Sequence, residues 1–234
     1  MPKRQPDLHG VVASRAAGEL AERSDVLAVM IAGSVARGEH VASSDVDLLV
    51  VTSEDAELQT SERSLVDGLL VEWIARPEAV WLSRFDRPKT SWLYAFLDAR
   101  IVSDSGPAAR LHAAARELLS TYRTSAKLRE LLATWLWHGQ AKLDRARRTG
   151  DLTVRGYWAA LFVETVVDGL YAVHDVPLPA GARRLEYLHL VPLTSGESDL
   201  LDSMLTGDTD RRFEATCALV ASLRQQLGAP DHGM

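Results

Sequence analysis

The stretch "GSVARGEHVASSDVDLLVV", residues 33 to 51, decides the fold. A Gly-Ser pair closes one apolar run, "DVLAVMIAG", and Asp45 and Asp47 lie two apart at the start of the next, "VDLLVV". Because side chains alternate along a strand, both aspartates project from one face while their apolar neighbours face the other. Two carboxylates held side by side repel each other unless a cation lies between them. Mg²⁺ takes one or two protein carboxylates and completes its shell with phosphate oxygens. The stretch therefore predicts two buried strands, the second of which carries two metal ligands.

A third carboxylate interrupts a later apolar run. Glu72 lies within "GLLVEWIA", residues 68 to 75, where a lone buried carboxylate would be costly. If this strand pairs beside the first two aspartates, the three carboxylates can hold two metal ions, as in in-line phosphoryl or nucleotidyl displacement. The alternative is that Glu72 forms a salt bridge on an edge strand.

The Gly-Ser turn fits the same interpretation. A strand that ends at Gly33 and Ser34 and turns into a short helix offers N–H groups and a hydroxyl to a phosphate, and Arg37 can add positive charge. The alternative for Arg37 is a plain surface residue. A P-loop is excluded because Glu39 and His40 stand where that motif requires Lys and Ser or Thr.

Strand signals are confined to the first half of the chain. Apolar runs predict strands near residues 25–33, 44–51, 68–75 and 99–104, whereas only helical periodicity follows the turn at Gly106. We therefore expect an α+β protein. A mixed β-sheet flanked by helices occupies residues 1–106 as the catalytic domain, and an all-α bundle occupies residues 107–234 on the acceptor side.

One helix of the second half carries an unusual acidic stripe. Residues 154–174 are apolar almost all round, except for a stripe that includes Glu164 and Asp168. These two carboxylates either attract a cationic acceptor or deprotonate its hydroxyl, or they form ion pairs with Arg183 or Arg184.

The composition indicates the class of partner and the cellular compartment. The net charge is −6, from 26 basic and 32 acidic residues, which argues against a nucleic-acid partner. Cys217 is the only cysteine, so no intrachain disulfide can form and a cytoplasmic protein is expected. No apolar run reaches the length of about 20 residues that a membrane span requires.

The Gly-Ser pair, the gap of ten residues, the "SDVDLLVV" strand and the later strand carboxylate resemble the DNA polymerase β-type nucleotidyltransferase superfamily. The similarity is greatest to its small bacterial members and to the aminoglycoside nucleotidyltransferases, which also have a helical C-terminal half. The resemblance implies that Asp45, Asp47 and Glu72 are metal ligands and that Gly33 and Ser34 hold the nucleoside triphosphate. In antibiotic-modifying members the third carboxylate, or one from the helical domain such as Glu164, also acts as a base.

These observations together predict an enzyme. We expect an ATP-binding, Mg²⁺-dependent transferase with two metal ions, which releases pyrophosphate and moves AMP from ATP, or another nucleoside monophosphate from its triphosphate, to a hydroxyl of a small-molecule acceptor. An aminoglycoside-like antibiotic is such an acceptor. The alternatives are a protein AMP-transferase or antitoxin-like regulator and a non-catalytic nucleotide-binding module. A homodimer is left open.

Overall fold

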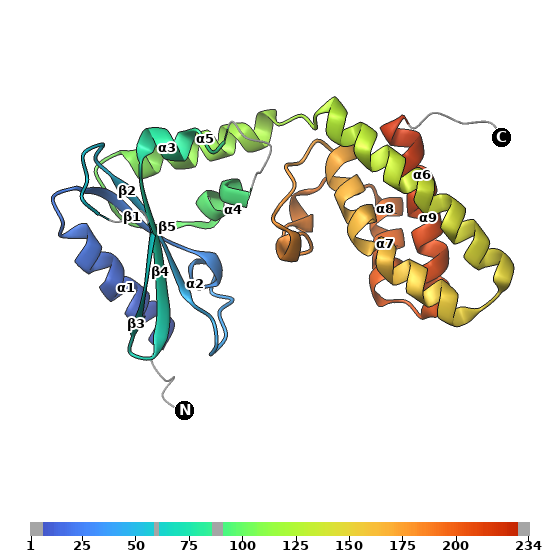
Figure 1. Cartoon of the computed structure of the whole chain (residues 1–234), viewed down its shortest axis with the longest axis horizontal. Coiled ribbons are helices and arrows are strands. Elements are labelled where there is room, and N and C mark those ends of the chain that lie inside the picture. Colours follow the sequence, from blue (N-terminus) through green and yellow to red (C-terminus); the bar gives the residue numbers. More distant parts are fainter. Residues whose placement is uncertain (1–6, 59–60, 86–90, 229–234) are drawn as a thin grey trace. The chain divides into compact units, whose positions relative to one another are not determined.

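The computed structural model describes residues 7–58, 61–85 and 91–228, and it divides into two compact units, residues 1–121 and 122–234 (Figure 1). The elements of the first unit are α1 (Leu8–Ala21), β1 (Val26–Ala32), α2 (Gly33–Arg37), β2 (Val46–Thr52), β3 (Ser61–Val66), β4 (Leu69–Pro77), α3 (Glu78–Leu82), α4 (Ser91–Asp98), β5 (Arg100–Asp104) and α5 (Pro107–Thr121). The elements of the second are α6 (Ala126–Thr149), α7 (Leu152–Val173), the 3-10 turns η1 (Gly181–Arg183) and η2 (Leu188–Leu190), α8 (Ser195–Thr206) and α9 (Thr209–Leu227).

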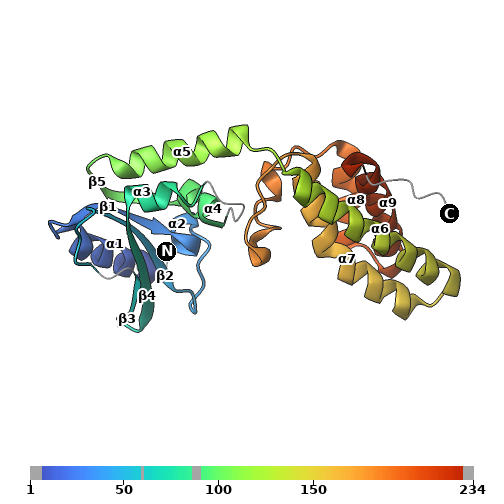
Figure 2. The same cartoon turned by 45° about the horizontal axis from the view of Figure 1, so that its top comes forward.

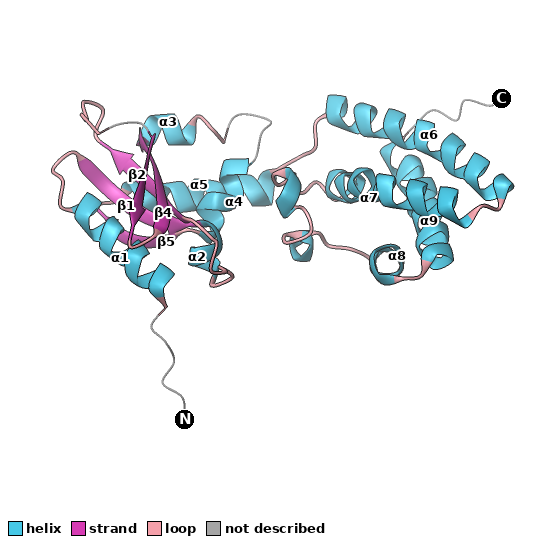
Figure 3. Cartoon of the chain, turned by 60° about the horizontal axis from the view of Figure 1, so that its bottom comes forward, coloured by secondary structure: helices cyan, strands magenta, loops and turns pink. Residues whose placement is uncertain are grey.

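The first unit is built on a mixed sheet with strand order β3-β4-β2-β1-β5. Strands β2 and β4 run parallel, and the other neighbours are antiparallel. Helix α1 lies on one side of the sheet, and α4 and α5 lie on the other (Figures 1 and 3). The expected α+β architecture, a mixed sheet with helices followed by a helical part, is confirmed.

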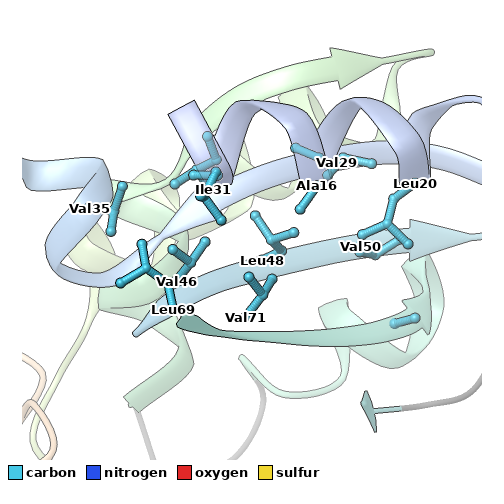
Figure 4. Close-up of a cluster of buried hydrophobic side chains, with 14 residues drawn as sticks. Ala16, Leu20, Val29, Ile31, Val35, Val46, Leu48, Val50, Leu69 and Val71 are labelled. Carbon is cyan, nitrogen blue, oxygen red and sulfur yellow. The ribbon is translucent and has the colours of Figure 1, made fainter. Parts of the chain in front are cut away.

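Alternation along the strands determines which side chains enter the core beneath α1. Every second residue of β2, namely Val46, Leu48 and Val50, is buried in the apolar cluster shown in Figure 4. Alanines of α1 allow the helix to approach the sheet closely. Because neighbours on a strand face opposite sides, Asp47 projects to the face opposite α1.

Strand β3 was not expected. Its sequence "SERSLV" is half polar, as suits an edge strand that has one open side. It forms a hairpin with β4 through Asp67 and Gly68, whose φ angles are both positive, at 51° and 81°. The Asp-Gly dipeptide is a strong signal for such a tight hairpin turn.

The described residues of the second unit form helices joined by loops and turns, with no strand among them (Figure 2). Helix α7 packs against both α6 and α9, and α8 packs against α9. The structural division lies after α5 rather than at residue 106, since α5 packs on α3, α4, β1 and β5. The catalytic and acceptor-side roles of the two parts stay predictions. None of the helices within the described ranges is long and apolar enough to cross a membrane.

Candidate functional site

Three carboxylates meet at the start of the parallel strand pair. Asp45 immediately precedes β2, Asp47 lies within it, and Glu72 lies in β4. The parallel register places Asp47 directly beside Glu72. One oxygen from each of the three side chains lies within 4.8 Å of the others. The structure therefore brings together the three residues that the sequence analysis proposed as metal ligands.

The pairing of the strands explains why these residues converge. Val46 and Val71, which are also paired across β2 and β4, are fully buried on the α1 side. Their neighbours Asp47 and Glu72 consequently share the opposite face, where both are half-buried. Carboxylates fixed on hydrogen-bonded strands have little freedom to move apart. Their mutual repulsion favours binding of a divalent cation.

A cationic side chain already contacts this cluster. Arg63 on β3 is the cross-strand partner of Glu72, and its Nη2 donates a hydrogen bond of 3.1 Å to Glu72 Oε1. This hydrogen bond raises the pKa of Arg63. Glu72 thus has the salt bridge of the structural alternative, but its strand β4 is interior to the sheet. Sequence reasoning missed Arg63 because it did not identify β3.

Gly33 lies against the cluster from the other side. Strand β1 ends at Ala32, which pairs with Asp47, so the chain turns next to the Asp47 carboxylate. Gly33 has φ +64°, and a Cβ atom added there would overlap that carboxylate. Both facts require glycine at this position. Ser34 follows directly and is half-buried. The nucleotide-binding role of Gly33 and Ser34 stays a prediction.

Arg37 is engaged in ion pairs. Its guanidinium contacts Glu39 at 2.7 Å and Asp98 at 3.2 Å, and its side chain is only 16% exposed. These contacts tie the end of α2 to the end of α4. They give Arg37 a structural use, and its expected contact with nucleotide stays a prediction.

One arginine pairs with both carboxylates of the acidic stripe in the helical unit. Arg184 forms ion pairs with Glu164 and with Asp168, the latter at 2.7 Å. Burial raises the pKa of Asp168 to about 7 and lowers the pKa of Arg184. The facing opposite charges offset part of that cost of burial. This arrangement matches the structural alternative for the stripe, and the catalytic and acceptor-binding roles of Glu164 and Asp168 stay predictions.

Comparison with known proteins agrees with the N-terminal site. Residues 13–96 match a family model described as a nucleotidyltransferase domain, and this range contains Gly33, Ser34 and all three carboxylates. The resemblance to the nucleotidyltransferase superfamily is thereby confirmed for this part of the chain. Among curated proteins, none matches the chain in sequence. Among solved structures, a nucleotidyltransferase-like protein from Exiguobacterium sibiricum matches 92% of this chain and 74% of its own, with 14% identity and a TM-score of 0.40. That likeness is too distant to support an argument about fold or activity.

Proposed function

Since residues 13–96 form a nucleotidyltransferase domain, we propose that the protein transfers a nucleoside monophosphate, AMP from ATP, to a hydroxyl of a small-molecule acceptor. The observation that carries this proposal is the cluster of Asp45, Asp47 and Glu72, with ligand atoms within 4.8 Å of one another at the start of two hydrogen-bonded strands. We place the reaction in the cytoplasm, on the basis of the single cysteine.

The cluster suits Mg²⁺ in its donor set. It offers only carboxylate oxygens, which hard cations prefer, and it leaves the remaining coordination positions to water and phosphate. Asp45, Asp47 and Glu72 would hold two such ions. When bound, Mg²⁺ neutralises charge on the triphosphate and stabilises the oxygens of an in-line displacement.

The reaction that we propose balances as follows. The acceptor oxygen forms a bond to the α-phosphorus, the bond from that phosphorus to the bridging oxygen breaks, and pyrophosphate leaves with the electron pair. The acceptor proton passes to a carboxylate, for which Glu72 is our assignment. Gly33 and Ser34 bind the leaving phosphates, where negative charge grows in the transition state. Glycine at position 33 serves this role because it lets the backbone lie beside Asp47.

The identification of the acceptor rests on the resemblance alone. An aminoglycoside-like antibiotic is our first hypothesis. The charge argument for a cationic acceptor weakens, because Arg184 pairs with both Glu164 and Asp168. A protein AMP-transferase uses the same chemistry on a protein side chain and is the second hypothesis. A non-catalytic nucleotide-binding module is the third, and the presence of all three carboxylates argues against it.

A pyrophosphate-release assay tests the proposal. Purified protein, MgATP and a panel of aminoglycosides, lincosamides and protein acceptors are mixed, and pyrophosphate and adenylated product are measured. We expect release that depends on one acceptor class and is lost in Asp45→Asn. Asp55→Asn is the matched control, since Asp55 is an exposed aspartate just beyond the other end of β2. Equal release by the wild type and Asp45→Asn would overturn the assignment.

A further inference from the structure

A second cluster of possible metal ligands lies near the first but differs from it in chemistry. Asp7 precedes α1, His9 lies in the first turn of that helix, and His40 follows α2. One ligand atom from each side chain lies within 4.8 Å of the others. The two imidazole rings have centroids 4.6 Å apart. The three side chains therefore meet at one point, although 31 residues separate the histidines in sequence (40 − 9).

In both histidines the hydrogen bond is formed by ring nitrogen Nε2. His9 Nε2 lies 3.1 Å from the carbonyl oxygen of Ser44, and His40 Nε2 lies 2.9 Å from Asp7 Oδ1. Both partners are acceptors, so in the neutral rings Nε2 carries the proton and Nδ1 carries the lone pair. A metal-ligating histidine shows this pattern, with its other ring N–H donated to a carbonyl or carboxylate oxygen; here those outer acceptors are the Ser44 carbonyl for His9 and the Asp7 carboxylate for His40.

Burial makes one of these lone pairs costly. His40 Nδ1 is buried and has no hydrogen-bond partner among the described residues. His9 is only 7% exposed. A buried polar atom without a partner costs about 1–3 kcal/mol. The Asp7 carboxylate pairs with His40 at 2.9 Å. These features are explained together if the two histidines share a cation.

We propose that His9 and His40 bind a divalent transition-metal ion of the Zn²⁺ class through their Nδ1 atoms, with Asp7 as the outer carboxylate that orients the His40 ring. Two imidazole nitrogens favour Zn²⁺ over Mg²⁺, because nitrogen ligands bind borderline-soft ions strongly and Mg²⁺ prefers oxygen. The carboxylate cluster of Asp45, Asp47 and Glu72 has the opposite preference. The chain thus carries two sites of different selectivity.

The position of this site indicates what the ion does. Ser44, whose carbonyl accepts the His9 hydrogen bond, directly precedes Asp45. The turn before it is closed by two hydrogen bonds between Val41 and Ser44, both of 2.9 Å. An ion held by His9 and His40 links the start of α1 to both ends of the 40–44 loop. It therefore holds Asp45 in place and acts as a positioning element for the carboxylate cluster.

Calorimetric titration of the full-length, tag-free protein with ZnCl₂ tests the site. Excess MgCl₂ is present so that the carboxylate cluster is occupied by Mg²⁺. We expect one Zn²⁺ per chain, and His40→Ala should lower the affinity at least about 100-fold, since even outer-shell changes at zinc sites cost 10–100-fold. His138→Ala is the matched control, because His138 is an exposed histidine in the helical unit. Asp47→Asn should retain the Zn²⁺ site.

Three results would overturn the proposal. They are no Zn²⁺ binding in excess Mg²⁺, equal affinity in His40→Ala and the wild type, and loss of binding in Asp47→Asn, which would locate the ion in the carboxylate cluster. If His40→Ala does not fold, NMR of the wild-type imidazole protons replaces it. Zn²⁺ should then shift the resonances of His9 and His40 first, and a first shift at any other histidine contradicts the assignment.

Discussion

Gly33→Ala is the change whose effect can be worked out most fully from the structure. Gly33 has φ +64°, a conformation that costs other residues about 1–2 kcal/mol. The added methyl would also overlap the Asp47 carboxylate, which must then move. Moving a catalytic group by about 1 Å can lower the rate about 100-fold. We therefore expect a modest loss of stability together with a large loss of activity.

Gly68→Ala separates these two effects. Gly68 also has a positive φ, +81°, but an added Cβ would meet nothing within 4 Å among the described residues. Both variants should lose about 1–2 kcal/mol of unfolding free energy, because both residues must adopt the left-handed conformation. Only Gly33→Ala should lose about 100-fold in kcat/KM, because only it displaces Asp47.

Urea unfolding followed by circular dichroism gives the stability, and pyrophosphate release with MgATP gives kcat/KM. The reasoning is refuted if folded Gly33→Ala retains the wild-type kcat/KM. It is also refuted if Gly68→Ala loses as much activity as Gly33→Ala, since the loss would then come from backbone strain alone.

Two further predictions concern stability. Asp168→Asn should lower the unfolding free energy by about 1.5 kcal/mol, because it removes the buried partner of Arg184 while Glu164 still pairs with that arginine. Glu164→Gln should cost less than about 1 kcal/mol because Glu164 is 69% exposed; equal shifts in urea midpoint would contradict this. Asp104 accepts three backbone N–H groups at the start of α5, and although partial burial acts to raise its pKa, these donors hold the pKa below the ordinary value. Asp104→Ala should therefore cost about 1 kcal/mol at pH 7, and the difference should vanish as the pH falls through the lowered native pKa; a difference that persists when Asp104 is protonated would be evidence against this cap.

The sequence predicts the parts of the fold that depend on local pattern. The apolar runs around Met30, Leu49, Ile74 and Ile101 locate four of the five strands, and alternation assigns Asp47 to the face opposite the α1 core. The sequence analysis does not predict strand β3, because the composition of this strand is polar, although the Asp67-Gly68 turn marks the hairpin. A change of composition cannot show against which unit a helix packs, so the division of the chain after α5 needs the tertiary contacts.

The candidate site depends on pairings between residues far apart in the sequence, and this limits how much of it the sequence can predict. The proximity of Glu72 to Asp47 depends on the parallel register of β2 and β4, which the sequence can only suggest. The meeting of His9 with His40 depends on how α1 packs across the sheet, and no local pattern marks it. The sequence offers the Arg184 pairs as one alternative for the acidic stripe, and the structure shows that they form.

The central claim is that Asp45, Asp47 and Glu72 form the metal-dependent nucleotide site. Calorimetric titration with ATP, with and without MgCl₂, tests it most directly on the wild type, Asp47→Asn and the exposed control Asp55→Asn. We predict Mg²⁺-dependent ATP binding by the wild type and by Asp55→Asn, and its loss in Asp47→Asn with the melting temperature retained. Mg²⁺-dependent binding of equal affinity in all three proteins would contradict the account.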